Sequence, residues 1–254
     1  MLLLWQHKCR IFSSLNNFMK FCIIIPCYNH SDNLKTLLGQ LPSDVLKIVV
    51  DDGSDEPVSA SAQNLQIFRF AKNSGKANAL KKGFELARQA DCTHAITIDS
   101  DGQHPVESLS EIVDVAQKNP QNIVVATRDF DNSEIPSGRK FLNKFSNFWF
   151  WAETGKTLAD TQCGYRCYPL ALLEKLGIAI GGFCFEVELL VKAAWAGFDF
   201  SEVKIPAIYN KQTLEKSHYR PIVDTFRFTM MNTRLFFTSL FLSKKMLKKI
   251  SLKK

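Results

Sequence analysis

Short apolar runs alternate with amphipathic stretches through the first half of the chain. Five runs rich in Ile, Val and Phe have the length of strands: Phe21–Pro26, Lys47–Asp51, Leu65–Phe70, His94–Asp99 and Ile123–Thr127. Three stretches between them have helical spacing: Asp32–Leu41, Lys76–Ala90 and Val106–Lys118. Strands that are apolar on both faces and alternate with helices predict an α/β fold, in which a doubly wound, mostly parallel sheet is covered on both sides.

The second half of the chain has a less regular pattern. An aromatic stretch at Gly138–Thr154 has helical spacing, and Gly181–Ala196 predicts a loop that leads into a helix near Phe185. A late strand is expected at Phe198–Ile205. A long aromatic helix is expected at Pro221–Leu242, and a lysine-rich tail follows it.

The two ends of the chain differ from its middle. Residues 1–5 are apolar, but basic residues follow too early for a signal peptide or a membrane span. Met19 directly precedes the first strand, so we expect translation to start there and residues 1–18 to be dispensable. The sequence has no internal repeat and no low-complexity linker. We therefore expect a single catalytic domain over residues 19–210, followed by an amphipathic helix and a basic tail over residues 211–254.

Composition narrows the class of protein. The 254 residues are 46% hydrophobic and 22% charged, which is typical of a globular protein with a full core. The net charge of +7 is compatible with a nucleotide, a phosphorylated acceptor or an anionic membrane, and it does not choose among them. The 7 cysteines contain no CxxC pair and no zinc-site spacing, so a reducing cytoplasm is the expected setting.

Candidate chemistry gathers where the predicted strands end. Asp99 and Asp101 lie two residues apart at a strand end, so strand alternation aims both carboxylates the same way. Paired carboxylates suit a hard divalent cation such as Mg²⁺ or Mn²⁺, and Gln103 offers a further oxygen ligand. The alternative is a turn that caps the next helix, and the spacing alone favours that alternative.

Two further polar segments fit a nucleotide site. Asp51 and Asp52 end the second strand and suit a ribose hydroxyl or a base edge, although the following Asp-Gly step is equally typical of a tight turn. Gly75 and Lys76 stand at a predicted helix start, where exposed amides and a lysine suit phosphate. The chain contains neither a P-loop pattern nor a GxGxxG after the first strand, which disfavours a nicotinamide-dependent dehydrogenase.

Several segments together resemble the successive motifs of family 2 glycosyltransferases. They match in order and spacing, and they are Phe21–Asn29, Val49–Ser54, Asn73–Gly83, Ile98–Pro105, Asp160–Arg166 and Phe185–Leu189. The likeness covers roughly residues 20–206 and is similar to the branch of dolichyl-phosphate mannose and glucose synthases. The resemblance implies a single domain with the glycosyltransferase A fold, a UDP- or GDP-linked sugar donor, a divalent metal and inversion at the anomeric carbon.

The resemblance also implies roles for the residues that match its motifs. Together with Gly75, Lys76 and Asp99, the expected donor-binding residues are Pro26, Tyr28, Asn29, Asp51, Asp52, Arg128 and Arg139. The expected metal ligands are Asp99, Asp101 and Gln103, and the expected catalytic residues are Asp160 and Asp101. Acceptor-side candidates are Gln162, Glu186, Glu188, His218 and Arg220. Asp160 is equally typical of a helix cap or a buried polar group, and we expect only one of Glu186 and Glu188 to serve the site because they diverge on a helix or a strand.

Departures from the family pattern leave the acceptor open. No QxxRW segment is present, which favours transfer of one sugar over polymerisation. The basic segment that follows the late strand in lipid-phosphate synthases is replaced by Ser217–Pro221. We expect a lipid-linked acceptor such as a polyprenyl phosphate, and the alternative is a hydroxyl of a non-phosphate lipid, a polyene or a glycan. The alternative from another class is an inactive scaffold that binds sugar nucleotides, whereas a nucleotidyltransferase is disfavoured because no GxGxR loop is present.

The helix at Pro221–Leu242 bears on the cellular location. It has no run of about 18 uncharged residues, so it is not a span. Arg227 and Arg234 fall on one face, and lysines follow, which predicts a helix lying on an anionic membrane. The alternative is a core helix with a solvated tail. We expect a cytoplasmic protein with peripheral contact to the cytoplasmic face of the membrane and no nucleic-acid partner.

Overall fold

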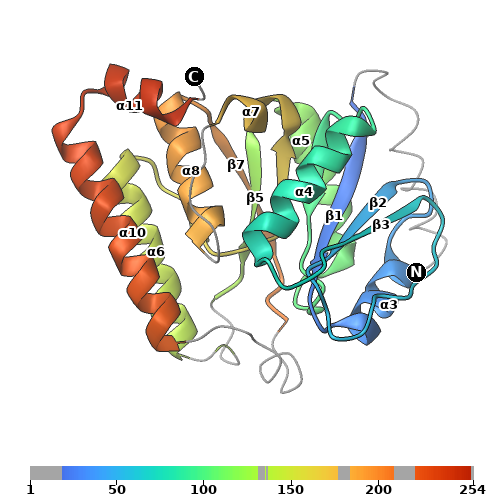
Figure 1. Cartoon of the computed structure of the whole chain (residues 1–254). Helices are drawn as coiled ribbons and strands as arrows, with labels where there is room; N and C mark the ends of the chain where they lie inside the picture. Colours follow the sequence, from blue (N-terminus) through green and yellow to red (C-terminus); the bar gives the residue numbers. More distant parts are fainter. Residues whose placement is uncertain (1–18, 131–134, 136, 177–183, 209–220, 253–254) are drawn as a thin grey trace.

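A seven-stranded sheet forms the centre of the protein (Figure 1). In the computed structural model, the described residues are 19–130, 135, 137–176, 184–208 and 221–252. In chain order the strands are β1 Phe21–Cys27, β2 Leu46–Asp51, β3 Leu65–Arg69, β4 His94–Thr97, β5 Ile123–Arg128, β6 Arg166–Pro169 and β7 Phe200–Ile205. The spatial order is β3-β2-β1-β4-β6-β5-β7, and β6 is antiparallel to both of its neighbours while the other pairs are parallel.

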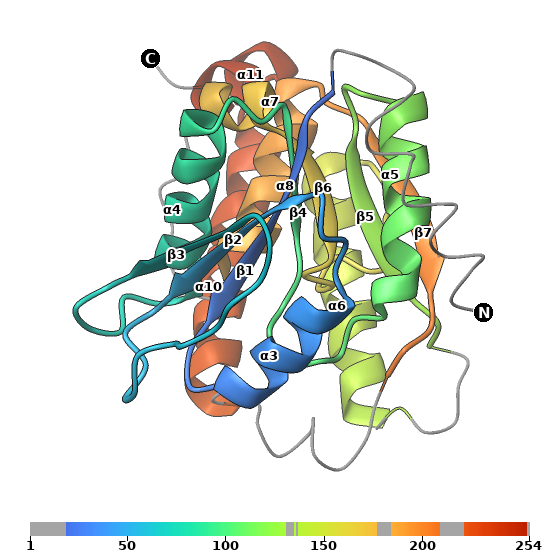
Figure 2. The same ribbon diagram turned by 90° about the vertical axis from the view of Figure 1, so that its right-hand side faces the viewer.

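Helices cover both faces of this sheet, as Figure 2 shows from the side. Their bounds are α3 Ser31–Gln40, α4 Lys76–Gln89, α5 Leu109–Lys118, α6 Ser137–Thr154, α7 Leu170–Lys175, α8 Phe185–Ala196, α10 Pro221–Phe241 and α11 Lys244–Ser251, with a short 3₁₀ turn, η1, at Val106–Ser108. Two hydrophobic cores lie on opposite faces of the sheet, and the side chains of β1 alternate between them. Ile23 lies in the core that contains residues of α3 and α5, and Ile24 lies in the core that contains residues of α4 and α8. The predicted doubly wound α/β fold is therefore confirmed.

The predicted strands and helices of the first half are confirmed with small shifts of their ends. The expected helix at Val106–Lys118 begins as the 3₁₀ turn, and the strand at His94 ends at Thr97. The prediction that the strands are covered on both faces is wrong for β3, because this strand lies at the edge of the sheet and its Ile67 side chain is 38% exposed. The antiparallel strand β6 and the lysine-rich helix α11 were not expected from the pattern.

A second layer of helices lies outside α8. α6 and α10 run side by side in the same direction (Figure 1), with ring centroids 6.3 Å apart for Phe145 and Phe228 and 5.8 Å apart for Trp149 and Phe236. α11 packs on α8 and buries Leu247. None of the helices that the structure describes is long and apolar enough to cross a membrane.

Candidate active site

The carboxyl ends of β1, β2 and β4 meet at one edge of the sheet, where ligands gather in open α/β folds. Asn29, just beyond β1, exchanges hydrogen bonds with Asp55 beyond β2, at 3.1 Å from Nδ2 to Oδ2 and 2.9 Å from the Asp55 amide to Oδ1. Asn33 of α3 donates to the carbonyl oxygen of Asp101 at 3.1 Å. The three loops are thus joined by hydrogen bonds into one surface.

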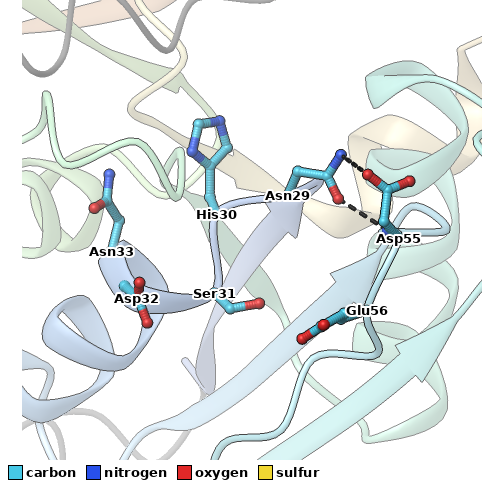
Figure 3. Close-up of a pocket in the computed structure, with 7 residues that line it drawn as sticks. All are labelled: Asn29, His30, Ser31, Asp32, Asn33, Asp55 and Glu56. Carbon is cyan, nitrogen blue, oxygen red and sulfur yellow. Dashed lines mark hydrogen bonds between the residues drawn. The ribbon is translucent and has the colours of Figure 1, made fainter.

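A pocket opens between the first two of these loops. Its volume is about 240 Å³. Figure 3 shows its lining side chains, which come from the end of β1, the start of α3 and the loop after β2: Asn29, His30, Ser31, Asp32, Asn33, Asp55 and Glu56. Asn33 connects this pocket to the loop of Asp101, so the pocket borders the predicted donor side.

Asp52 fixes the start of α4. Its two carboxylate oxygens accept hydrogen bonds from the amides of Ser74 and Gly75, each at 2.8 Å. Burial raises the pKa of Asp52, and these two amides oppose that rise. Gly53 has a φ of +72°, and a Cβ there would lie 2.4 Å from the carbonyl carbon of Lys72, so the approach of the two loops requires glycine.

Lys76, the first residue of α4, lies between two carboxylates. Its Nζ is 2.7 Å from Oδ1 of Asp99 and 2.9 Å from Oε2 of Glu186. Burial alone would lower the pKa of Lys76, but the two negative charges raise it well above its usual value. In the same way, Lys76 and His104 hold the pKa of Asp99 well below its usual range against the effect of burial. The site therefore contains an ammonium held by two carboxylates beside Ile98–Pro105, the segment that we call the acidic loop.

Asp160 is fully buried and holds Arg128. Nε of Arg128 donates to Oδ2 at 2.6 Å and Nη2 donates to Oδ1 at 3.0 Å, which is a bidentate pair. The amides of Gln162 and Cys163 also donate to Oδ1, at 3.2 and 3.1 Å. Both oxygens of Asp160 are thus engaged, and the guanidinium of Arg128 is held in place at the end of β5.

The remaining predicted site residues differ in their burial and in their hydrogen-bond partners. The carboxylate of Asp51 is buried and accepts from the amides of Ser54 and Val58 and from Arg69. Oδ1 of Asp101 accepts from the amide of Gln103 at 2.9 Å. Pro26 is buried in β1, Tyr28 and Arg139 are half-buried, and Gln162 is exposed.

The two acidic residues of α8 diverge. Glu186 faces Lys76, whereas Glu188 is buried beside Lys192, 3.0 Å away, and Arg234 of α10, 3.6 Å away. The structure therefore brings Glu186, and not Glu188, to the acidic loop. His218 and Arg220 lie outside the described residues.

Two residues near the site were missed as candidates, although both lie in segments that carry the family resemblance. Nε2 of His104 lies 3.4 Å from Oδ2 of Asp99. Arg166 is fully buried and donates to the carbonyl oxygens of Thr161, Cys163 and Glu186. Polar residue type at a predicted strand end could have indicated His104, but nothing in the sequence pattern indicated that Arg166 would be buried.

The sequence match decides the family. The model of glycosyl transferase family 2 matches residues 22–177. The chain belongs to glycosyl transferase family 2. It is a glycosyltransferase, as the resemblance implied. The loops described above lie inside the matched range, whereas the first turn of α8, which carries Glu186, lies outside it.

Two sequence relatives agree with this family, and a solved structure shares the fold. Polyprenol monophosphomannose synthase of Mycolicibacterium smegmatis is 27% identical over 209 residues, covering 76% of this chain and 78% of that protein. Undecaprenyl-phosphate 4-deoxy-4-formamido-L-arabinose transferase of Proteus mirabilis is 26% identical over 179 residues, covering 65% of this chain and 53% of that protein. Glucosyl-3-phosphoglycerate synthase from Mycobacterium tuberculosis, solved with Mn²⁺, UDP and glucosyl-3-phosphoglycerate, superposes with a TM-score of 0.60 at 14% identity, covering 87% of this chain and 80% of that chain. The last similarity concerns the fold alone.

Proposed function

We propose that this chain is an inverting, metal-dependent glycosyltransferase that moves one sugar from a UDP- or GDP-linked donor to a polyprenyl phosphate at a membrane surface. The observation that carries the proposal is the cluster in which Lys76 joins Asp99 to Glu186 beside the Asp101 loop. Two relatives support the acceptor class, because their names contain a polyprenol or undecaprenyl phosphate.

The acidic loop fits a divalent cation that arrives with the donor. Within the described residues, no group of three or more His, Cys, Asp and Glu side chains forms a ready-made metal cage. Mg²⁺ is often held by one or two carboxylates together with substrate phosphates, and Asp99 and Asp101 supply such a pair. When bound, the cation would neutralise negative charge on the departing nucleotide diphosphate.

The reaction is a single displacement at the anomeric carbon. An acceptor oxygen forms a bond to that carbon while the bond to the diphosphate oxygen breaks, and its electron pair leaves with the diphosphate. Among the described residues, Lys76 and Arg128 are cations placed to stabilise this charge, and each is oriented by an acidic partner, Glu186 and Asp160 respectively. The fixed positions of these groups lower the cost of orientation at the moment of reaction.

The engagement of Asp160 favours a phosphate acceptor. A hydroxyl acceptor must lose a proton to a base within hydrogen-bond reach. Asp160 was predicted to activate or position the acceptor, but Arg128 and two backbone amides donate to both of its oxygens. A phosphate oxygen is already anionic at neutral pH and needs no such base. We therefore propose that Asp160 positions Arg128 and does not take a proton.

Exposed apolar side chains support contact with a membrane. On α6, Phe141, Phe148 and Trp151 are more than half exposed, while Asn143, Ser146 and Glu153 are buried. On α10 and α11 the exposed apolar residues are Phe226, Met230, Phe237, Leu240, Phe241, Met246 and Ile250. We call these ten side chains the outer apolar face. A face of this kind, flanked by Arg227, Arg234 and the lysines of α11, is typical of a surface that lies in a lipid interface.

Transfer of a labelled sugar tests the proposal. UDP- and GDP-sugars are incubated with vesicles containing undecaprenyl phosphate, undecaprenol or no acceptor, with Mn²⁺ or EDTA. We expect a labelled, acid-labile lipid only with undecaprenyl phosphate and Mn²⁺. Equal transfer to undecaprenol would refute the phosphate acceptor. A protein that binds the donor without transferring or hydrolysing it would be the inactive scaffold.

A further inference from the structure

Lys76 occupies a place that suits a positive charge. Its Nζ lies within 2.9 Å of one oxygen of Asp99 and one of Glu186, and the side chain is only 23% exposed. The backbone before it is fixed, because the amides of Ser74 and Gly75 donate to the two oxygens of Asp52. The lysine is therefore built into the acidic loop and does not hang into solvent.

The surroundings leave little room at this cluster. A Cβ on Gly164 would lie 2.6 Å from Oδ2 of Asp99 and 3.1 Å from Nζ of Lys76. The main chain of Glu186 is also held, because its carbonyl oxygen accepts from Nη1 of Arg166 at 2.8 Å. A divalent cation that approached Asp99 would face the ammonium at close range, and the two positive charges would repel.

Glu186 offers the lysine a second partner. Its Oε2 already contacts Lys76, and its Oε1 is buried without a hydrogen-bond partner among the residues that the structure describes. An unpaired buried carboxylate oxygen is costly, and a lysine that moves fully onto Glu186 would engage it. Glu186 can thus hold the ammonium of Lys76 after that ammonium has left Asp99.

We propose that Lys76 is a built-in counter-cation: it neutralises Asp99 in the ligand-free protein, and it moves onto Glu186 when a divalent cation takes Asp99. This inference rests on the metal assignment in the proposed function. It has a direct consequence for binding: the protein alone holds the cation weakly, because the cation must displace Lys76 from Asp99.

Manganese binding without nucleotide tests this role. Free Mn²⁺ is followed by its electron paramagnetic resonance signal during titration of the wild type, Lys76→Met and Lys72→Met. We expect Lys76→Met to bind Mn²⁺ about tenfold more tightly, which corresponds to about 1.4 kcal/mol. Lys72 is exposed in the preceding loop, so Lys72→Met removes the same charge away from Asp99 and should change the affinity less than about twofold. A folded Lys76→Met protein, judged by circular dichroism, that binds Mn²⁺ no more tightly than the wild type overturns the proposal.

A double-mutant cycle tests the part played by Glu186. Glu186→Gln should weaken Mn²⁺ binding more in the wild type than in Lys76→Met, because only the wild type has a lysine that needs a second partner. Equal losses in both backgrounds would exclude this role. Asp101→Ala distinguishes a failure of the metal assignment from a failure of the counter-cation role. If this variant binds Mn²⁺ as the wild type does, the metal assignment itself fails. If it abolishes binding while Lys76→Met has no effect, only the counter-cation role fails.

Discussion

Replacement of Arg166 by Met should destabilise the protein strongly. The guanidinium is fully buried and joins the loop after α6 to the first turn of α8. Nε donates to the carbonyl oxygen of Cys163 at 2.6 Å, Nη2 donates to that of Thr161 at 2.8 Å, and Nη1 donates to that of Glu186 at 2.8 Å. Arg166→Met has a similar length but no donors, so all three carbonyl groups lose these bonds.

The size of the loss follows from this count. Each buried carbonyl left without a partner costs about 1–3 kcal/mol, and burial of the uncharged Met side chain offsets part of the sum. We expect the free energy of unfolding to fall by about 3–5 kcal/mol, a large share of the 5–15 kcal/mol that is typical of a folded domain. The same change also releases the loop that holds Asp160 from α8, so transfer activity should fall in the molecules that remain folded.

Urea unfolding followed by circular dichroism measures this loss. The midpoint should fall while the dependence on urea stays the same, because the surface exposed on unfolding is unchanged. Arg88→Met is the matched control: Arg88 lies on the surface of α4, 3.4 Å from the exposed Glu174, and its loss should cost less than about 1 kcal/mol. A loss below 1 kcal/mol for Arg166→Met would refute the view that this residue holds the two segments together.

Three further predictions follow from the site, the core and the outer apolar face. Gly164→Ala should weaken Mn²⁺-dependent nucleotide binding about tenfold in calorimetry, because the added methyl group would lie 2.6 Å from Oδ2 of Asp99 and force this carboxylate to move. Burial raises the pKa of Glu153 to about 9, so between pH 5 and about 9 the folded protein holds a proton that the unfolded chain has lost. The wild type should therefore lose stability relative to Glu153→Gln as the pH rises through this window, as thermal unfolding will show. Phe148→Ser with Phe237→Ser should reduce flotation with anionic vesicles.

Each of these predictions has an outcome that contradicts it. Wild-type affinity in Gly164→Ala would mean that the cluster around Asp99 can shift at no cost. A constant difference in melting temperature between the wild type and Glu153→Gln across the pH window would mean that Glu153 is solvated. For flotation, Ile67→Ser on β3 removes an exposed apolar side chain elsewhere, and an equal loss in that control would exclude a specific outer apolar face.

Much of the fold could be predicted because its strands have simple patterns. β1, β2 and β5 are short apolar runs buried on both faces, and such runs with helices between them have few other solutions. β6 could not be predicted, because it is four residues long and begins with the charged Arg166. The buried guanidinium of Arg166 is satisfied by carbonyl oxygens of the preceding loop and of Glu186 in α8, and no local pattern indicates the contact with α8.

The sequence indicated which residues belong to the candidate site, but it did not indicate which of their side chains pair with each other. Asp99, Asp101 and Asp52 stand at strand ends, where parallel topology brings side chains together. The pairing of Lys76 with Glu186 joins residues more than one hundred positions apart, and only the packing of α8 against α4 creates it. The same holds for the ion pair between Asp160 and Arg128, which the sequence pattern did not indicate.

The outer apolar face was only half predictable. The spacing of Arg227 and Arg234 indicated an amphipathic α10, whereas the aromatic pattern of α6 indicated a helix but not which of its faces would be exposed. In the fold α6 turns Asn143 and Glu153 inward and Phe148 outward, the reverse of a usual surface helix. The direction of a helix face is set by neighbouring elements, so the pattern alone could not decide it.

Nucleotide binding by Asp101→Ala tests the central claim most directly. Titration calorimetry would measure UDP and GDP with Mn²⁺ and with EDTA, with Asp114→Ala on the exposed surface of α5 as the control. The proposed site predicts that one nucleotide binds the wild type and the control with Mn²⁺, and that EDTA or Asp101→Ala weakens this binding by about 100-fold or more. Wild-type affinity in a folded Asp101→Ala protein with Mn²⁺ would contradict the assignment of the acidic loop to a metal and donor site.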